Sequence, residues 1–94
     1  MTQRTAAALA RLDELLASLN TLSRSDDVGR VIEDAEALRR AVAAFHMEAI
    51  RFRMYSVDRD LKAIGDDPAV RERYEAVRQA LEAAGFHTRS HTAP

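Results

Sequence analysis

Hydrophobic residues recur three or four positions apart along most of the chain, which is the spacing of an amphipathic helix. The first segment with this spacing has a broad leucine face, made of Leu9, Leu12, Leu15, Leu16, Leu19 and Leu22. A narrower stripe near the C-terminal end consists of Val70, Tyr74, Val77, Leu81 and Ala84. The pattern therefore predicts a helix in each of these two segments.

The segment between them carries two apolar stripes. The first stripe consists of Val28, Val31, Ala35, Leu38, Val42, Phe45, Ala49 and Phe52, and the second of Met47, Ile50, Met54, Val57, Leu61 and Ile64. The second stripe is two residues out of phase with the first, which places it about 200° around a helix. Residues 26–64 contain no proline, and their single glycine, Gly29, lies near the start. We therefore expect one unbroken helix with apolar residues on two opposite sides.

Residues that start and stop helices divide the chain at three places. Ser25 is a suitable N-cap, and the acidic residues after it suit the first turn of a helix. Gly65 suits the left-handed position after a helix, and Asp67 and Pro68 suit the N-cap and first position of the next one. Gly85 marks a third helix end. The predicted helices cover residues 5–22, 26–64 and 68–84 of a single domain (1–86), followed by a disordered tail (87–94).

The composition favours a fold made only of helices. The chain has 94 residues, of which 47% are hydrophobic but only 5% aromatic, so it suits closely packed helices better than a wide core. A helix over residues 26–64 would be about 58 Å long, about twice the length of either neighbour. Neither neighbour covers it completely. The sequence therefore predicts an all-α fold of three helices with one long central helix, in a bundle completed by antiparallel homodimerisation.

The charges suggest a register for this dimer. Suppose that two central helices cross antiparallel at the small residues Ala43 and Ala44. Glu33 of one copy then faces Arg53 of the other, and the other charged residues along the crossing also face residues of opposite charge. The predicted interface consists of Glu33, Glu36, Arg39, Ala43, Ala44, Met47, Glu48, Ile50, Arg51, Arg53 and Met54. The last helix is expected to pack on the later stripe, at residues 57–64.

Composition also limits the classes of function and the compartment. There is no cysteine, which excludes disulfides and thiolate metal sites and favours a cytoplasmic protein. The N-terminal residues lack an apolar stretch of signal-peptide length, and His46 and Glu48 interrupt the longest apolar run. We therefore expect neither export by a signal peptide nor a membrane-spanning segment.

One short motif suggests an enzyme. Arg40 and His46 are separated by five residues, and this spacing resembles the Arg-x(4–6)-His signature of the HEPN ribonucleases. These are all-helical proteins whose active sites form at a dimer cleft. The resemblance covers these two residues alone. It implies, as an alternative function, a dimeric ribonuclease that uses Arg40 and His46.

Neither a metal site nor a cofactor site is predicted. His87 and His91 have the spacing of one helix face, but they follow a helix stop in the predicted tail. The central segment has no Glu-x-x-His sequence, which is the pattern of di-iron bundles. We therefore expect no cofactor.

A second alternative is binding of a nucleic acid or another anion. Arg39, Arg40, Arg51 and Arg53 supply hydrogen-bond donors for phosphate, and Tyr55 supplies a ring for stacking. Against this, 14 basic residues are balanced by 15 acidic ones, and the net charge is −1. The function that the sequence favours is therefore self-association or interaction with another protein.

Overall fold

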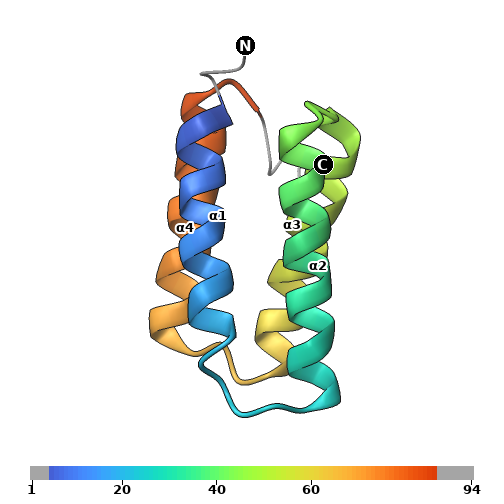
Figure 1. The fold of residues 1–94 in the computed structure, drawn as a ribbon, viewed down its shortest axis with the longest axis vertical. Helices are drawn as coiled ribbons and strands as arrows, with labels where there is room; N and C mark the ends of the chain where they lie inside the picture. Colours follow the sequence, from blue (N-terminus) through green and yellow to red (C-terminus); the bar gives the residue numbers. More distant parts are fainter. Residues whose placement is uncertain (1–4, 87–94) are drawn as a thin grey trace, which may run out of the picture.

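The structure, a computed structural model, describes residues 5–86, and this part of the chain forms four α-helices. They are α1 (Ala6–Leu19), α2 (Asp26–Ala43), α3 (Met47–Ala63) and α4 (Pro68–Ala83). Successive helices run in opposite directions, so the fold is an up-down-up-down bundle (Figure 1). The prediction of an all-α fold is confirmed. The prediction of three helices with one long central helix is wrong, because residues 26–64 form two helices.

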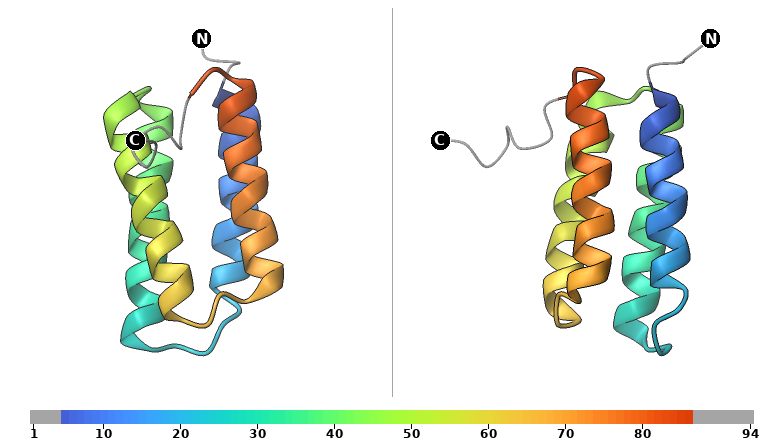
Figure 2. Two further views of the ribbon diagram at one scale, coloured as in Figure 1. Left: turned by 180° about the vertical axis from the view of Figure 1, so that it is seen from behind. Right: turned by 90° about the vertical axis from the view of Figure 1, so that its left-hand side faces the viewer.

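The bundle is assembled from two helix pairs. α1 packs most extensively on α4, and α2 packs on α3. α1 also contacts α2, whereas α3 and α4 contact each other least among the neighbouring helices (Figure 2). The main partner of α4 is therefore α1, and not residues 57–64 as the sequence predicted. One long side of α3 is left without an extensive helical neighbour.

Apolar side chains from all four helices fill the space between the pairs. The largest fully buried residues are Leu12, Leu15 and Leu19 of α1, Val31, Leu38 and Val42 of α2, Ile50, Met54, Val57 and Leu61 of α3, and Tyr74 and Leu81 of α4. These residues recur at helical spacing, so each helix directs one stripe inward. The core is thus closed within a single chain.

The predicted helix caps are confirmed. The Ser25 side chain accepts a hydrogen bond from the Val28 N–H at 3.1 Å, and it caps α2. The Asp67 carboxylate caps α4, with Pro68 at the start of the helix. Gly65 and Gly85 follow α3 and α4 with φ angles of 97° and 99°, in the left-handed region that favours glycine.

The turn between α2 and α3 uses the same C-cap geometry without a glycine. Phe45 has a φ angle of 62°, and its N–H donates to the Val42 carbonyl at 3.1 Å. The His46 N–H donates to the Ala41 carbonyl at 3.0 Å. This pair of bonds is the Schellman arrangement. His46 then caps α3, since its Nδ1 accepts from the Ala49 N–H at 3.3 Å.

This turn explains the phase change between the two apolar stripes. The first stripe is buried up to Val42, and the second is buried from Ile50 to Leu61. A helix that reverses direction after Ala44 presents a new face to the core, so its apolar residues start a new phase. The shift therefore marks a boundary between two helices, and not two faces of one helix.

We expect glycine at position 45 to be more stable than alanine there. Both substitutions remove the ring, but only alanine retains the Cβ that disfavours the left-handed conformation, a difference of about 1 kcal/mol. Urea denaturation of Phe45→Gly and Phe45→Ala measures it. In a continuous helix the order would be reversed, because alanine makes a helix interior more stable than glycine does, by about 1 kcal/mol.

Candidate functional site

The candidate site is the side of α3 that points away from the core. Phe52 is 56% exposed and Tyr55 is 44% exposed, although both are large aromatic residues. Ile50 and Met54, on the opposite side of the helix, are fully buried. The sequence had placed Phe52 in the first buried stripe, and the turn at Phe45 turns it outward instead.

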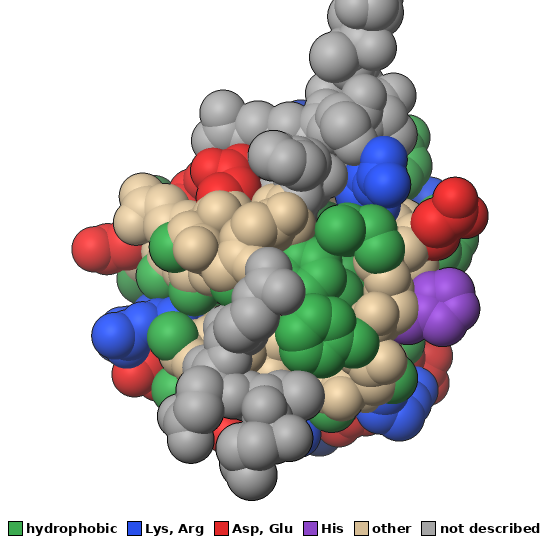
Figure 3. Space-filling view, turned by 90° about the horizontal axis from the view of Figure 1, so that it is seen from above, with side chains coloured by type: hydrophobic (Ala, Val, Ile, Leu, Met, Phe, Trp, Pro, Cys, Tyr) green, Lys and Arg blue, Asp and Glu red, His purple; other side chains and the backbone are tan. Residues whose placement is uncertain are grey.

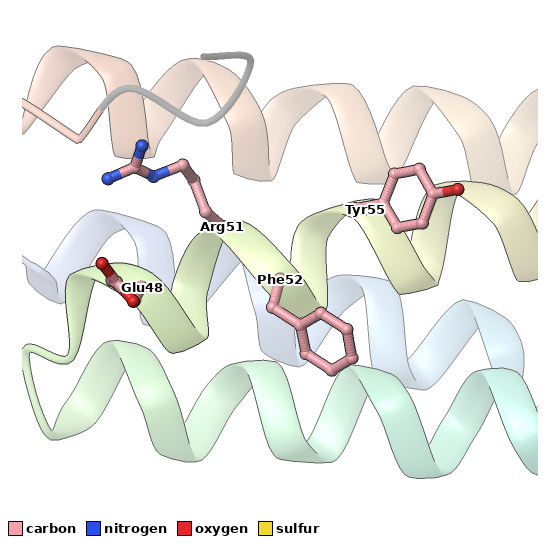
Figure 4. A pocket seen from close by; sticks show the side chains of 4 residues that line it. All are labelled: Glu48, Arg51, Phe52 and Tyr55. Carbon is pink, nitrogen blue, oxygen red and sulfur yellow. The ribbon is translucent and has the colours of Figure 1, made fainter. Parts of the chain in front are cut away.

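An open hollow of about 260 Å³ lies on this side of α3. Glu48, Arg51, Phe52 and Tyr55 line it, and all of them come from α3. Figure 4 shows Arg51 and Tyr55 on the side nearer α4, and Phe52 on the side nearer α2. The hollow is thus lined by two aromatic rings and by charges of both signs.

Arginine side chains lie over both exposed rings. The Arg53 guanidinium is 5.1 Å from the centre of the Phe52 ring, and the Arg59 guanidinium is 6.0 Å from the centre of the Tyr55 ring. Contacts of this kind are favourable by about 0.5 to 1 kcal/mol at exposed sites. Each exposed ring therefore has a cationic neighbour on the same helix.

A second apolar cluster lies at the end of the bundle where α2 meets α3. The rings of Phe45 and Phe86 are 5.4 Å apart, and Met47 is exposed beside the turn. Viewed from this end, hydrophobic side chains gather near the middle of the surface (Figure 3). This cluster lies at the end of the bundle and is separate from the hollow on the outer side of α3.

Two of the four arginines named as possible anion ligands, Arg39 and Arg53, form ion pairs with other helices. Arg39 reaches Asp13 of α1 at 2.7 Å, and its hydrogen bond lowers the pKa of that carboxyl group. Arg53 contacts Asp34 of α2 at 3.0 Å. Each of these guanidinium groups therefore lies beside a carboxylate of a neighbouring helix, which weakens its attraction for an anion.

The residues of the predicted dimer interface are divided between core and surface. Ile50 and Met54 are fully buried in the chain's own core, so they are not surface residues of this fold. The other members are exposed or half-buried: Glu33, Glu36, Arg39, Ala43, Ala44, Met47, Glu48, Arg51 and Arg53. The predicted register assumed an unbroken helix through Ala43 and Ala44, and the chain reverses there. Homodimerisation itself stays a prediction.

Arg40 and His46 lie on either side of the α2–α3 turn. Arg40 is exposed in the last turn of α2. His46 is exposed as well, but its Nδ1 accepts the capping hydrogen bond from Ala49. This gives His46 a role in starting α3. The ribonuclease hypothesis stays a prediction.

Within residues 5–86, no three side chains of histidine, aspartate or glutamate come together as metal ligands. The predicted tail, with His87 and His91, lies outside the described residues. None of the four described helices is both long enough and apolar enough to cross a membrane.

A buried carboxyl group lies between α2 and α3. The Asp60 side chain is only 6% exposed, and its Oδ2 has no hydrogen-bond donor among the described residues. The pKa of Asp60 is raised to about 6, chiefly by burial and then by the neighbouring carboxyl group of Asp34, while Arg59 acts to lower it. This group is therefore close to titration at neutral pH.

A polar network connects α3 to α4 on their sparsely packed side. Arg71 of α4 contacts Asp58 of α3 at 2.7 Å and Asp66 of the connecting turn at 2.8 Å. Burial acts to raise the pKa of Asp58, but hydrogen bonds from Arg71 and Lys62 outweigh it and lower this pKa. The network holds the two helices together where apolar contact is least.

Comparison with protein-family models, with curated proteins and with solved structures finds no match to this chain.

Proposed function

We propose that this chain is a self-association module, in which a second copy packs against the outer side of α3. The observation that carries the proposal is the exposure of Phe52 and Tyr55 on one side of a helix whose opposite side is buried. Aromatic residues are enriched in protein interfaces and supply much of the binding free energy there.

The distribution of exposed apolar side chains supports this surface. The large hydrophobic residues that are exposed in residues 5–86 are Phe45, Met47, Phe52 and Tyr55. All of them come from the α2–α3 turn and the first half of α3. Of these residues, Phe52 and Tyr55 lie on the outer side of α3, three positions apart, whereas Phe45 and Met47 lie at the end of the bundle.

The charges around the rings favour a protein partner over a polyanion. Glu48 and Arg59 lie on the same side of α3 as the two rings. Nearby Arg53 contacts Asp34. A surface of mixed charge suits a partner of mixed charge, and a second copy of the chain provides one. A nucleic acid would require a continuous excess of positive charge.

Phe52→Glu is expected to disrupt the dimer. It places a charge where an aromatic ring would be buried, and loss of such an anchor costs about 2 kcal/mol or more, which corresponds to about 30-fold in the dissociation constant. Sedimentation equilibrium of the full chain over a range of concentrations measures this constant. Gln79→Glu, at an exposed position of α4, is the matched control and should leave it unchanged.

The proposal fails if the wild-type chain sediments as a monomer at every concentration. It fails also if Phe52→Glu and Gln79→Glu have equal effects, since the outer side of α3 would then have no special role.

A further inference from the structure

We infer that the second copy docks antiparallel along α3, on a two-fold axis that passes between Phe52 and Tyr55, so that Glu48 of each copy faces Arg59 of the other. The inference rests on the proposed function and adds the orientation of the partner and the residues that recognise it.

The four residues form one continuous stripe. Glu48, Phe52, Tyr55 and Arg59 are four, three and four positions apart. At 3.6 residues per turn they fall within an arc of about 60°. All four are exposed, and the helix directs its buried residues to the opposite side. Alternating steps of four and three are the spacing along which two helices pack side by side.

The order of residue types along this stripe is self-complementary. From either end it reads as one charged residue, two aromatic residues and one charged residue, and the two end charges have opposite signs. An antiparallel two-fold axis at its centre therefore places Phe52 opposite Tyr55 and Glu48 opposite Arg59. Because the interface is isologous, each of these pairs occurs twice.

The charges select this orientation. A parallel arrangement would place Glu48 opposite Glu48 and Arg59 opposite Arg59, and like charges at a contact are unfavourable. The antiparallel arrangement replaces both repulsions with attractions. The same two residues therefore favour one orientation and disfavour the other.

Both end groups are able to contact a partner. Glu48 makes no ion pair within residues 5–86, and it lies exposed in the first turn of α3. The Arg59 side chain is 55% exposed and reaches Asp60 only through Nε and Nη2, at 3.4 and 3.3 Å. A guanidinium group has five N–H donors, so Nη1 has donors that these contacts with Asp60 do not use.

The stripe covers about three helical turns, which makes a small interface. Interfaces that bury less than about 1,200 Å² are commonly weak and transient. We therefore expect a dissociation constant in the micromolar range or weaker, and the experiments below need high protein concentrations.

A charge-reversal cycle tests the register. We expect Glu48→Arg and Arg59→Glu each to raise the dissociation constant of the full-length dimer at least ten-fold. The double variant restores opposite charges at both ends and is expected to return to within about three-fold of the wild-type constant. Glu36→Arg, on the exposed side of α2, is the matched control and is expected to have no effect. Circular dichroism confirms that each variant is folded.

A second measurement covers the case in which a reversal prevents folding. Raising the salt concentration from about 0.05 M to about 0.5 M should weaken the wild-type dimer by screening these pairs, and should affect the Glu48→Gln dimer much less. Equal salt dependence of the two dimers would contradict the register.

The outcomes separate the inference from the proposed function. If Phe52→Glu disrupts the dimer but the reversals do not, or the double variant is not rescued, the register is wrong and the interface is right. If the wild-type chain is a monomer at all concentrations, both are wrong.

Discussion

Tyr74→Ala is expected to lower the free energy of unfolding by about 4 kcal/mol, because it removes the largest fully buried side chain of the bundle. The Tyr74 ring lies in the core with the guanidinium groups of Arg71 and Arg78 at 5.1 and 5.2 Å from its centre. Its hydroxyl donates to the Met54 carbonyl of α3 at 2.9 Å. The substitution therefore opens a cavity and also removes a bond between two helices that contact each other little.

Two controls separate these contributions. Tyr74→Phe retains the ring but loses the hydroxyl, which is expected to cost about 1 kcal/mol. Tyr55→Ala removes the other tyrosine of the chain from an exposed position, and about 1 kcal/mol or less is expected. Urea denaturation at low protein concentration keeps self-association out of the comparison. A loss below about 1 kcal/mol for Tyr74→Ala would contradict the packing of α4 described above.

The sequence predicted the helix ends wherever the capping residues were of the usual kinds. Ser25, Asp67 and Pro68 start helices as expected, and Gly65 and Gly85 end them. At these positions the local chemistry determines the backbone conformation almost alone. These helix ends could therefore be predicted from the sequence without any knowledge of how the helices pack.

The sequence does not predict the boundary between α2 and α3, because the residue in the left-handed position after the C-cap is a phenylalanine, Phe45, and not a glycine. Position 45 therefore lacks the glycine that usually marks a helix end. The left-handed conformation of Phe45 is unfavourable by about 1 kcal/mol in isolation. Packing of its ring against Phe86 and capping of α3 by His46 offset this penalty, and both depend on the folded state. The shift between the two apolar stripes is the available signal, but on a single helix it predicts two apolar faces and no turn.

The missed turn also changed the interpretation of the charges. The sequence predicted antiparallel pairing of the two halves of residues 26–64, with Glu33 of one copy facing Arg53 of another. The structure has an antiparallel pairing within one chain, in which Asp34 contacts Arg53 at 3.0 Å. Opposite charges in two blocks favour antiparallel helices whether the helices belong to one chain or to two. Charge patterns alone cannot distinguish these cases, because the distinction depends on a turn.

The candidate site was only partly accessible from the sequence. Glu48 and Arg51 were predicted to lie at an interface, whereas Phe52 was assigned to the buried stripe. Which aromatic residues of α3 remain exposed depends on the rotation of the helix about its axis. That rotation is set by Ile50, Met54 and their neighbours in the core, and it is defined only after the turn is known.

The second large effect concerns Asp60, whose replacement by asparagine is expected to stabilise the bundle at pH 7. In the folded chain the pKa of Asp60 is raised to about 6 from an ordinary value of 3.8, chiefly by burial and then by Asp34. The folded state therefore binds the proton more tightly than the unfolded state. This contribution to stability is fully present below pH 3.8 and is lost as the pH rises to about 6.

At pH 7 the charged Asp60 therefore costs up to about 3 kcal/mol relative to its neutral form, at 1.36 kcal/mol for each pKa unit. Asp60→Asn keeps a group of similar shape without the charge, and its amide is able to donate to Asp34 in place of the carboxyl proton. We expect a gain of about 1 to 3 kcal/mol at pH 7 that falls to less than half at pH 4.5. The other charged groups beside this pair of carboxyl groups are Arg53, which contacts Asp34, and Arg59, which contacts Asp60.

Urea denaturation of the wild-type chain and the Asp60→Asn variant at both pH values measures this difference. Carboxyl groups away from position 60 contribute equally to the two chains, so the difference reports the pair formed by Asp60 and Asp34. Glu33→Gln, at an exposed position of α2, is the control for removing one negative charge, and its effect should be small at both pH values. A variant that is less stable than the wild-type chain at pH 7 would mean that the ionised carboxylate of Asp60 is favourable in the folded state, through contact with Arg59 or with a bound cation.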